Sequence, residues 1–214
     1  MKRIGFSLEE IKEHMQHYTL DFSAAVLRKQ LTSIEQQIHE LKVIKSRIEH
    51  RCIQLEQSAS ISKDSTKITI THEKSQYLLV QKVDPPYTQE SVSMTTKNCF
   101  VRSLKEKLPV FFQSGAIVPL KNIQNKRYTE ASFVFLPIKN PHYKNVVQLP
   151  ERKCVSTCHT GDYLSIGTAY EHLLKYCRIN HLTILPDAYE FAINDYLSTK
   201  DENEYITRIL LYVK

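Results

Sequence analysis

Residues 21–57 read DFSAAVLRKQLTSIEQQIHELKVIKSRIEHRCIQLEQ and contain neither glycine nor proline. Apolar side chains recur in this stretch at spacings of mainly three and four residues, with a lysine in the one slot where an apolar residue is missing. The positions are Leu27, Leu31, Ile34, Ile38, Leu41, Lys45, Ile48, Cys52 and Leu55. This spacing is a heptad seam. It predicts one long helix with a narrow apolar stripe.

The apolar stripe needs a surface against which it can be buried. A helix of this length spans on the order of 50 Å, which is longer than one small core requires. A second copy of the same helix is the simplest partner, and packing against the chain's own domain is the alternative. We therefore expect a homodimer that is held together by residues 21–57.

A run of small and polar residues, Ser58–Ser65, follows the helix and indicates a domain boundary. Beyond it the periodicity changes from helical to extended. Helices are predicted at 91–107 and 166–177, and strands at 67–71, 77–83, 115–120, 131–138, across 146–158, at 189–193 and at 205–213. The order strand, helix, strand, strand occurs twice. The sequence thus predicts an α+β fold, with a long dimerisation helix followed by two β-α-β-β halves.

The composition is that of a globular protein. The 214 residues are 42% hydrophobic and 24% charged. The sequence contains no run of about 18 apolar residues, the length that a membrane-spanning helix needs. Five cysteines, an odd number, are scattered along a chain that is large enough to fold without disulfides. We expect a cytoplasmic protein with reduced thiols and no membrane partner.

The net charge of +6 is unevenly distributed. Residues 65–150 hold 12 basic and 5 acidic side chains, whereas residues 151–214 hold 7 basic and 9 acidic ones. A basic middle third is compatible with work near DNA, but basic faces also occur on proteins that never contact it. The charge alone therefore does not decide between these classes.

Two parts of the sequence resemble a known family. Arg3–Lys12, RIGFSLEEIK, is similar to the stretch after the wing in MerR-family regulators, where a short helix, here expected at 8–17, leads into an antiparallel coiled coil. The last third resembles the GyrI-like domain of the multidrug-sensing branch, in four pieces with the family's order and spacing. They are Gly161-Asp162-Tyr163, Ile166-Gly167-Thr168-Ala169-Tyr170-Glu171, Tyr189-Glu190-Phe191 and Glu204-Tyr205-Ile206-Thr207.

The resemblance implies a domain plan and a function. Residues 1–18 would be a remnant of the DNA-binding domain, 19–60 the dimerisation helix and 61–214 the effector-binding domain. The family has a winged helix-turn-helix before the position of Gly5, where this sequence has four residues, so we expect either a fragment or a naturally shortened regulator. Promoter DNA would then be a partner only if that element were supplied. The resemblance implies a sensor of a small-molecule effector, with no enzymatic activity and no cofactor.

Glu190 is the first candidate for the effector site. The resemblance points to an acidic residue in a pocket lined by aromatic side chains, and the match falls on this position. In a strand, Ala188, Glu190 and Ala192 share one face, which leaves open space above the carboxylate, while the opposite face holds the bulky side chains. A solvated glutamate on a strand face is the alternative interpretation.

Four aromatic residues complete the predicted site. Tyr163 and Tyr205 match pocket positions of the family, and their rings would hold a lipophilic, cationic aromatic compound by stacking and cation–π attraction. Tyr87 and Phe133 are placed on the opposite wall by the internal repeat alone. Each of the four could instead be an ordinary core residue, since the chain has 12 tyrosines and 8 phenylalanines.

One residue departs from the family pattern. Relatives usually have a glutamate where Arg208 follows Thr207, and an arginine that reached Glu190 would cancel the charge of the pocket. Strand alternation places Arg208 and Tyr205 on opposite faces, which argues against such a contact.

Two other functions fit parts of the sequence. Cys154 and Cys158 could bind a soft metal ion, but on one strand they would lie about 13 Å apart. A GyrI-like hydrolase could use Glu190 as general base and Tyr163 as proton donor. A long helix that transmits a signal is not needed by a hydrolase.

Overall fold

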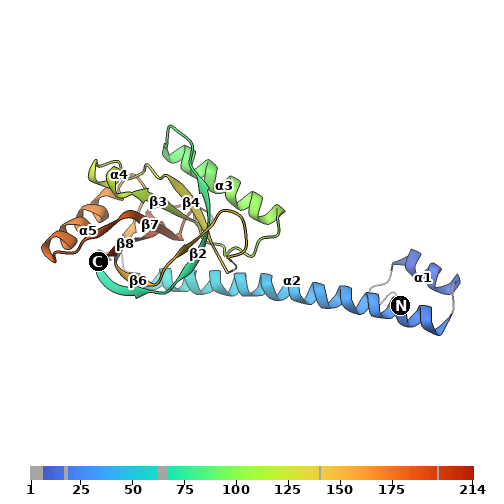
Figure 1. Cartoon of the computed structure of the whole chain (residues 1–214). Helices are drawn as coiled ribbons and strands as arrows, with labels where there is room; N and C mark the ends of the chain where they lie inside the picture. The colour runs from blue at the N-terminus through green and yellow to red at the C-terminus, as the bar shows by residue number, and fades with distance from the viewer. Residues whose placement is uncertain (1–6, 17–18, 62–66, 140, 197) are drawn as a thin grey trace. The chain divides into compact units, whose positions relative to one another are not determined.

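The computed structural model (Figure 1) describes residues 7–16, 19–61, 67–139, 141–196 and 198–214. The chain divides into two compact units, Met1–Ser46 and Arg47–Lys214. Helix α2 (Leu20–Ser60) contributes its first part to one unit and its last turns to the other. No helix within the described ranges is long and apolar enough to cross a membrane.

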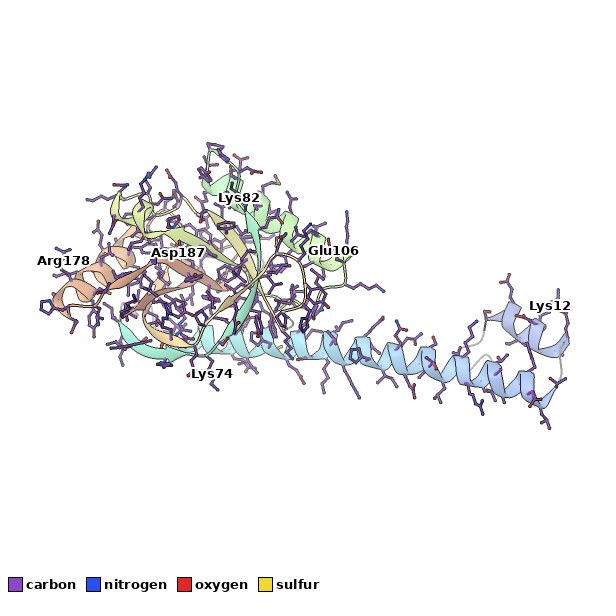
Figure 2. All side chains as sticks on the ribbon, viewed as in Figure 1. Lys12, Lys74, Lys82, Glu106, Arg178 and Asp187 are labelled. Carbon is purple, nitrogen blue, oxygen red and sulfur yellow. The ribbon has the colours of Figure 1, made fainter. Side chains whose placement is uncertain are left out.

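The first unit is helical. It contains α1 (Leu8–Gln16) and the beginning of α2, and both helices were expected from the sequence. Side chains project from α2 all around its axis (Figure 2), and much of the heptad seam is exposed in the single chain. The exposed seam residues of this unit are Leu27, Leu31, Ile38 and Leu41. One chain alone therefore leaves this apolar stripe uncovered.

Helix α2 extends further than expected. It ends at Ser60 instead of Gln57, so the first residues of the predicted linker are helical. Alanine favours a helix and single serines oppose it only weakly, which explains why a small-residue run did not end it. Of the remaining linker, Ile61 is described and the following residues lie outside the described ranges.

Eight strands form one antiparallel sheet in the second unit. They are β1 (Thr69–Glu73), β2 (Gln76–Lys82), β3 (Gly115–Pro119), β4 (Phe133–Ile138), β5 (Val146–Leu149), β6 (Arg152–Thr160), β7 (Ile184–Asn194) and β8 (Ile206–Val213). Their order across the sheet is β1-β6-β8-β7-β3-β4-β2-β5. The strands alternate in direction throughout.

The sheet has the predicted twofold repeat. One half is β2, α3 (Gln89–Lys105), β3 and β4, and the other is β6, α5 (Gly167–Ile179), β7 and β8. The two halves meet where β3 pairs with β7. Their flanking strands are exchanged, because β1 precedes the first half but pairs with β6, while β5 precedes the second half and pairs with β2. This exchange ties the halves into one sheet.

Core residues lie on both faces of the sheet. On one face, α5 packs on a cluster that includes Tyr170, Ala188 and Ile209, and α3 packs on a second cluster around Cys99. The opposite face holds Phe135, Phe191 and other apolar residues, and the last turns of α2 border a groove on that face. The bulky side chains predicted on the face opposite Ala188 lie in a core cluster, but the Ala188 face also holds core residues, which was not expected.

Some predicted boundaries differ from the structure. The predicted strand 115–120 ends at Pro119, and a short helix, α4 (Leu120–Gln124), follows it without a break. Strand β7 begins at Ile184, five residues before the predicted start, and has a register shift before Ala188. The irregular start explains why strict alternation detected only its second half. A 3-10 turn, η2 (Glu202–Glu204), precedes β8.

Candidate functional site

A cavity of about 80 Å³ lies between α3, the central strands and the start of α5. Its lining comprises apolar, aromatic and hydroxyl-bearing side chains around one carboxylate. The lining residues are Gln89, Val92, Ser93, Thr96, Ser114, Gly115, Ala116, Tyr128, Thr129, Ala131, Tyr163, Ile166, Glu190, Ala192, Tyr196 and Thr207. Small residues predominate on the central strands, which leaves room above the carboxylate.

Glu190 lies near the middle of the sheet. It pairs with Ala116 of β3 on one side and with Ile209 of β8 on the other. A glycine next to Ala116 is required here, because a Cβ on Gly115 would lie 2.3 Å from the backbone oxygen of Glu190 and 2.1 Å from the ring of Phe135. The backbone on this side of the cavity is therefore packed too closely for a larger residue.

The carboxylate of Glu190 has one strong partner in the described chain. The hydroxyl of Tyr170 donates a hydrogen bond to its Oε1 at 2.6 Å. Burial raises the pKa of Glu190 to about 7, although this hydrogen bond opposes the rise. Burial, followed by the charge of Glu190, also raises the pKa of Tyr170 well above its ordinary value. No lysine or arginine of the described residues forms an ion pair with Glu190.

Stacked tyrosines support this carboxylate. The ring of Tyr128 is nearly parallel to that of Tyr170, with 5.6 Å between the ring centroids, and its hydroxyl donates to Glu171 at 3.2 Å. A Cβ on Gly167 would lie 2.7 Å from the Tyr128 ring. The glycine at the first turn of α5 therefore allows Tyr128 to lie against the helix and fix the Tyr170 hydroxyl.

A second cleft, of about 250 Å³, adjoins the cavity and shares Tyr163 and Tyr196 with it. We call the two spaces the inner cavity and the outer cleft. Tyr205 lines the outer cleft, where its ring contacts that of Tyr163 with 5.7 Å between the centroids. The ammonium group of Lys97 lies 5.6 Å from the centroid of the Tyr196 ring. With Tyr163, Tyr196 and Tyr205 in its lining, the outer cleft is thus aromatic as well.

The structure brings together three of the five predicted site residues. Glu190 and Tyr163 line the inner cavity, and Tyr205 lines the adjoining cleft. Tyr87 packs instead against the core cluster under α3, and Phe133, 37% exposed, lies at the start of β4. Neither of these two lines the cavity or the cleft.

Chain direction explains where Tyr87 lies. It follows β2 and precedes α3, as Tyr163 follows β6 and precedes α5. β2 and β6 are five positions apart in a sheet whose neighbouring strands are all antiparallel, so they run in opposite directions. The loops that follow them therefore lie at opposite ends of the sheet, and the repeat does not place Tyr87 across from Tyr163.

Sequence reasoning missed Tyr170 and Tyr128. Tyr170 belongs to the quoted stretch Ile166–Glu171, but no role was predicted for it. Its ring is fully buried in the core, and the hydroxyl at its end reaches the site. Tyr128 lies in a turn and has no detectable sequence pattern.

Arg208 does not reach Glu190. It lies opposite Phe191 on the other face of the sheet, and its guanidinium donates to Glu73 at 2.5 Å. Cys154 and Cys158 lie on β6, opposite Tyr212 and Arg208 of β8. Burial raises the pKa of both thiols. Among the described residues, no three histidine, cysteine or acidic side chains are grouped so that they could hold a metal ion.

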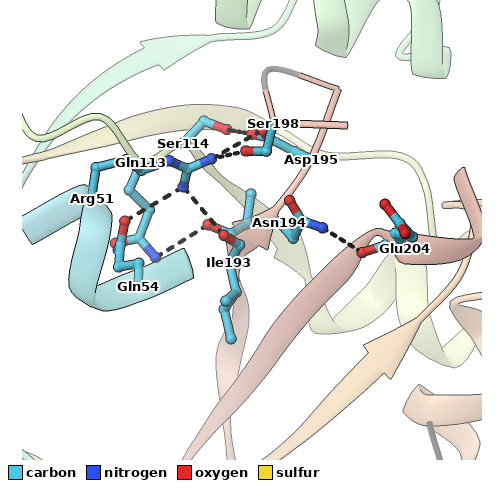
Figure 3. A network of polar contacts seen from close by, with 10 residues as sticks. Arg51, Gln54, Gln113, Ser114, Ile193, Asn194, Asp195, Ser198 and Glu204 are labelled. Carbon is cyan, nitrogen blue, oxygen red and sulfur yellow. Dashed lines mark hydrogen bonds and ion pairs between the residues drawn. The ribbon is translucent and has the colours of Figure 1, made fainter. Parts of the chain in front are cut away.

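A polar network connects α2 with the wall of the cavity (Figure 3). The guanidinium of Arg51 donates to the backbone oxygen of Ile193 at 3.2 Å, contacts the hydroxyl of Ser198 and lies 3.5 Å from a carboxylate oxygen of Asp195. The side chain of Asp195 is 2% exposed, and its other oxygen accepts from Ser114, a cavity residue, at 3.5 Å. Arg51 of α2 is therefore connected through Asp195 to Ser114 in the wall of the cavity.

Comparisons with known proteins agree with this architecture. Residues 1–51 match the family model described as MerR, DNA binding. No curated protein matches the chain in sequence. The chain is similar in structure to EcmrR in a cryo-EM EcmrR–DNA complex, with a TM-score of 0.56 and 16% identity over 100% of this chain and 79% of that one.

The crystal structure of the EcmrR C-terminal domain gives the same TM-score and identity over 69% of this chain and 97% of that domain. At such low identity the likeness establishes the fold. The family-model match covers residues 1–51 alone. The comparisons therefore relate the N-terminal part of the chain to MerR DNA-binding proteins, and the fold of 69% of the chain to the EcmrR C-terminal domain.

Proposed function

We propose that this chain is the effector-sensing and dimerising part of a MerR-type transcription regulator, and that it binds a lipophilic, cationic aromatic compound at Glu190. One observation supports the proposal above all others. A carboxylate is buried in an aromatic cavity with a tyrosine hydroxyl beside it, and no basic residue of the described ranges is paired with it. Burying a charge without an opposite charge is costly, and a bound cation removes that cost.

The two adjoining spaces suit a ligand with two rings. The positively charged ring would lie in the inner cavity beside Glu190, and the second ring would lie in the outer cleft between Tyr163 and Tyr205. Aromatic faces attract cations by about 0.5–2 kcal/mol at such sites. The tyrosines thus supply affinity for the rings, and Glu190 supplies selectivity for charge.

The binding experiment compares a cation with a neutral compound of the same shape. We expect calorimetry at pH 8 to show that 4-benzyl-N-methylpyridinium binds the full chain more tightly than the uncharged 4-benzylpyridine. Replacing Glu190 by glutamine keeps the shape and should remove this difference. Equal affinity of the two compounds for the wild-type chain would contradict a charge-selective site.

The Arg51 network supports a route from the cavity to α2. Asp195 and Ser198 flank Tyr196, which forms a wall of both spaces, and all three residues follow the end of β7. A ligand that displaces Tyr196 would therefore change the contacts of Arg51 on α2 (Figure 3). Through this helix, occupancy of the cavity would be transmitted to the N-terminal unit.

The exposed seam on α2 supports dimerisation through residues 21–57. Leu41 exposes 64% of its surface in the single chain, and Leu27, Leu31 and Ile38 expose about half of theirs. Pairing with a second copy would bury this stripe, and apolar burial is worth about 25 cal/mol per Å². Light scattering at tens of micromolar should give the mass of a dimer, and a monomer there would contradict the assignment.

A hydrolase is the second candidate, because a carboxylate with a pKa of about 7 is suited to act as a general base at neutral pH. The two functions differ in the fate of the compound. A sensor releases its ligand unchanged, whereas a hydrolase would cleave an activated ester such as 4-nitrophenyl acetate in a manner that depends on Glu190. We expect that replacing Glu190 by glutamine does not lower the rate of ester hydrolysis.

A further inference from the structure

Two hydroxyl groups in the cavity wall lack a hydrogen-bond partner in the described chain. They are Oγ1 of Thr207 and the phenolic oxygen of Tyr196. Both atoms are almost fully covered by protein, and Thr207 exposes 2% of its surface. Buried hydroxyls in folded proteins are nearly always paired, because burial removes their hydrogen bonds to water and only a new partner offsets that free-energy cost. Of the buried polar atoms without a partner in the described chain, these two belong to residues that line the inner cavity.

The neighbouring polar groups of the cavity, in contrast, are paired. Ser114 donates to Asp195, Thr96 donates to the backbone oxygen of Val92 at 2.9 Å, and Glu190 accepts from Tyr170. These three polar groups of the wall are thus satisfied. The hydroxyls of Thr207 and Tyr196 differ from them in having no partner in the described chain.

Thr207 lies close to the carboxylate. It is opposite Ala192 in the pairing of β7 with β8, while Glu190 is opposite Ile209. Thr207 and Glu190 are therefore diagonal neighbours on one face of the sheet, and such pairs lie roughly 7–8 Å apart. One small molecule can contact both side chains.

We propose that Thr207 and Tyr196 form a subsite that binds a hydrogen-bond acceptor, such as a carbonyl or ether oxygen, on the same molecule whose cation pairs with Glu190. The inference rests on the proposed cation site and narrows its ligand class. Each hydroxyl has a hydrogen to donate. A ligand that had only hydrogen-bond donors would leave the hydroxyl hydrogens of Thr207 and Tyr196 unpaired. Donors of the ligand are instead suited to the carboxylate of Glu190, which accepts hydrogen bonds. The preferred effector is thus a cationic aromatic compound with an acceptor a few ångströms from its charge.

A pair of cations that differ in one group tests the subsite. In 4-benzoyl-N-methylpyridinium a carbonyl replaces the methylene of 4-benzyl-N-methylpyridinium, and the charge and both rings are retained. We expect calorimetry on the full chain to show a preference for the benzoyl compound of roughly five- to tenfold. The preference should fall towards one in Thr207→Val and in Tyr196→Phe, while the affinity for the benzyl compound stays within about twofold.

Thr96→Val is the matched control. It also removes a threonine hydroxyl from the cavity wall, but one that is already paired within its helix. The preference for the benzoyl compound should survive in this variant. In the absence of ligand, Thr207→Val should unfold at the same temperature as the wild type or higher, because it removes an unpaired buried hydroxyl.

The outcomes separate the subsite from the cation site. A benzoyl preference that persists in both Thr207→Val and Tyr196→Phe overturns the subsite, as does equal binding of the two cations by the wild type, which would mean that water satisfies the hydroxyls. In either case the discrimination between 4-benzyl-N-methylpyridinium and 4-benzylpyridine would still hold. Loss of that discrimination overturns the cation site itself, and the subsite with it.

Discussion

Replacing Glu190 by glutamine should stabilise the ligand-free chain while it weakens cation binding. The amide has the same shape and can still accept the hydrogen bond of Tyr170. It carries no charge, so the cost of burying a carboxylate disappears. A residue that is retained for fold stability would behave in the opposite way.

The size of the effect follows from the pKa of Glu190, which burial raises from 4.5 to about 7. Below pH 4.5 the carboxyl is protonated in both the folded and the unfolded chain. As the pH rises from 4.5 through 7, the unfolded chain loses this proton first, so stability is lost across that window. Each tenfold change in proton affinity corresponds to about 1.4 kcal/mol, so the stability lost above pH 7 is at most about 3.5 kcal/mol. Glutamine avoids this loss.

Thermal unfolding followed by circular dichroism measures the effect. At pH 8 the Glu190→Gln variant should unfold at a temperature roughly 5–10 °C above the wild type, and the difference should nearly vanish at pH 4.5. Glu171→Gln makes the same chemical change at an exposed carboxylate and should have an effect below about 1 kcal/mol. A Glu190→Gln variant that is less stable than the wild type at pH 8, or equally shifted at both pH values, would refute the reasoning.

Further predictions concern the helix, the tyrosine and the arginine. Ile38→Asp combined with Leu41→Asp should give a monomer or an insoluble chain by light scattering, because two charges cannot be buried in the seam; a soluble dimer would exclude this seam. Tyr170→Phe removes the hydrogen bond that favours the charged carboxylate, so the pKa of Glu190, measured as the midpoint of cation binding against pH, should rise. A midpoint that stays in place or falls would contradict this assignment. Arg51→Met should bind 4-benzyl-N-methylpyridinium with wild-type affinity but abolish the ligand-induced change in hydrogen exchange along α2, and an unaltered change would rule out this route.

Local patterns were enough to predict much of the fold. The heptad spacing identified α2 without any knowledge of its partner, because a seam of this kind is a property of one helix. The repeated order of strand and helix predicted the two halves. The exchange of β1 and β5 between the halves could not be predicted, since pairing between distant strands leaves no trace in the periodicity of either strand.

The site was predictable where one strand supplied it. Glu190 between two alanines is visible in the sequence, and strand alternation also separated Arg208 from Tyr205 correctly. The partner of the carboxylate was not visible, because Tyr170 is on a helix and its hydroxyl meets Glu190 only in the folded chain. Tyr87 was misplaced relative to the cavity for a related reason. The repeat gave its position in the topology but not the direction of its strand.

The dependence of cation affinity on pH shows whether an ionised Glu190 binds the ligand. Calorimetry with 4-benzyl-N-methylpyridinium at pH 6 and pH 8 compares a mostly protonated with a mostly ionised Glu190, given its pKa of about 7. Affinity for the wild-type chain should rise by up to about tenfold between these values, in proportion to the ionised fraction. In Glu190→Gln the affinity should not change between them. A rise of the same size in the variant, or none in the wild type, would contradict the claim that a buried carboxylate selects the cation.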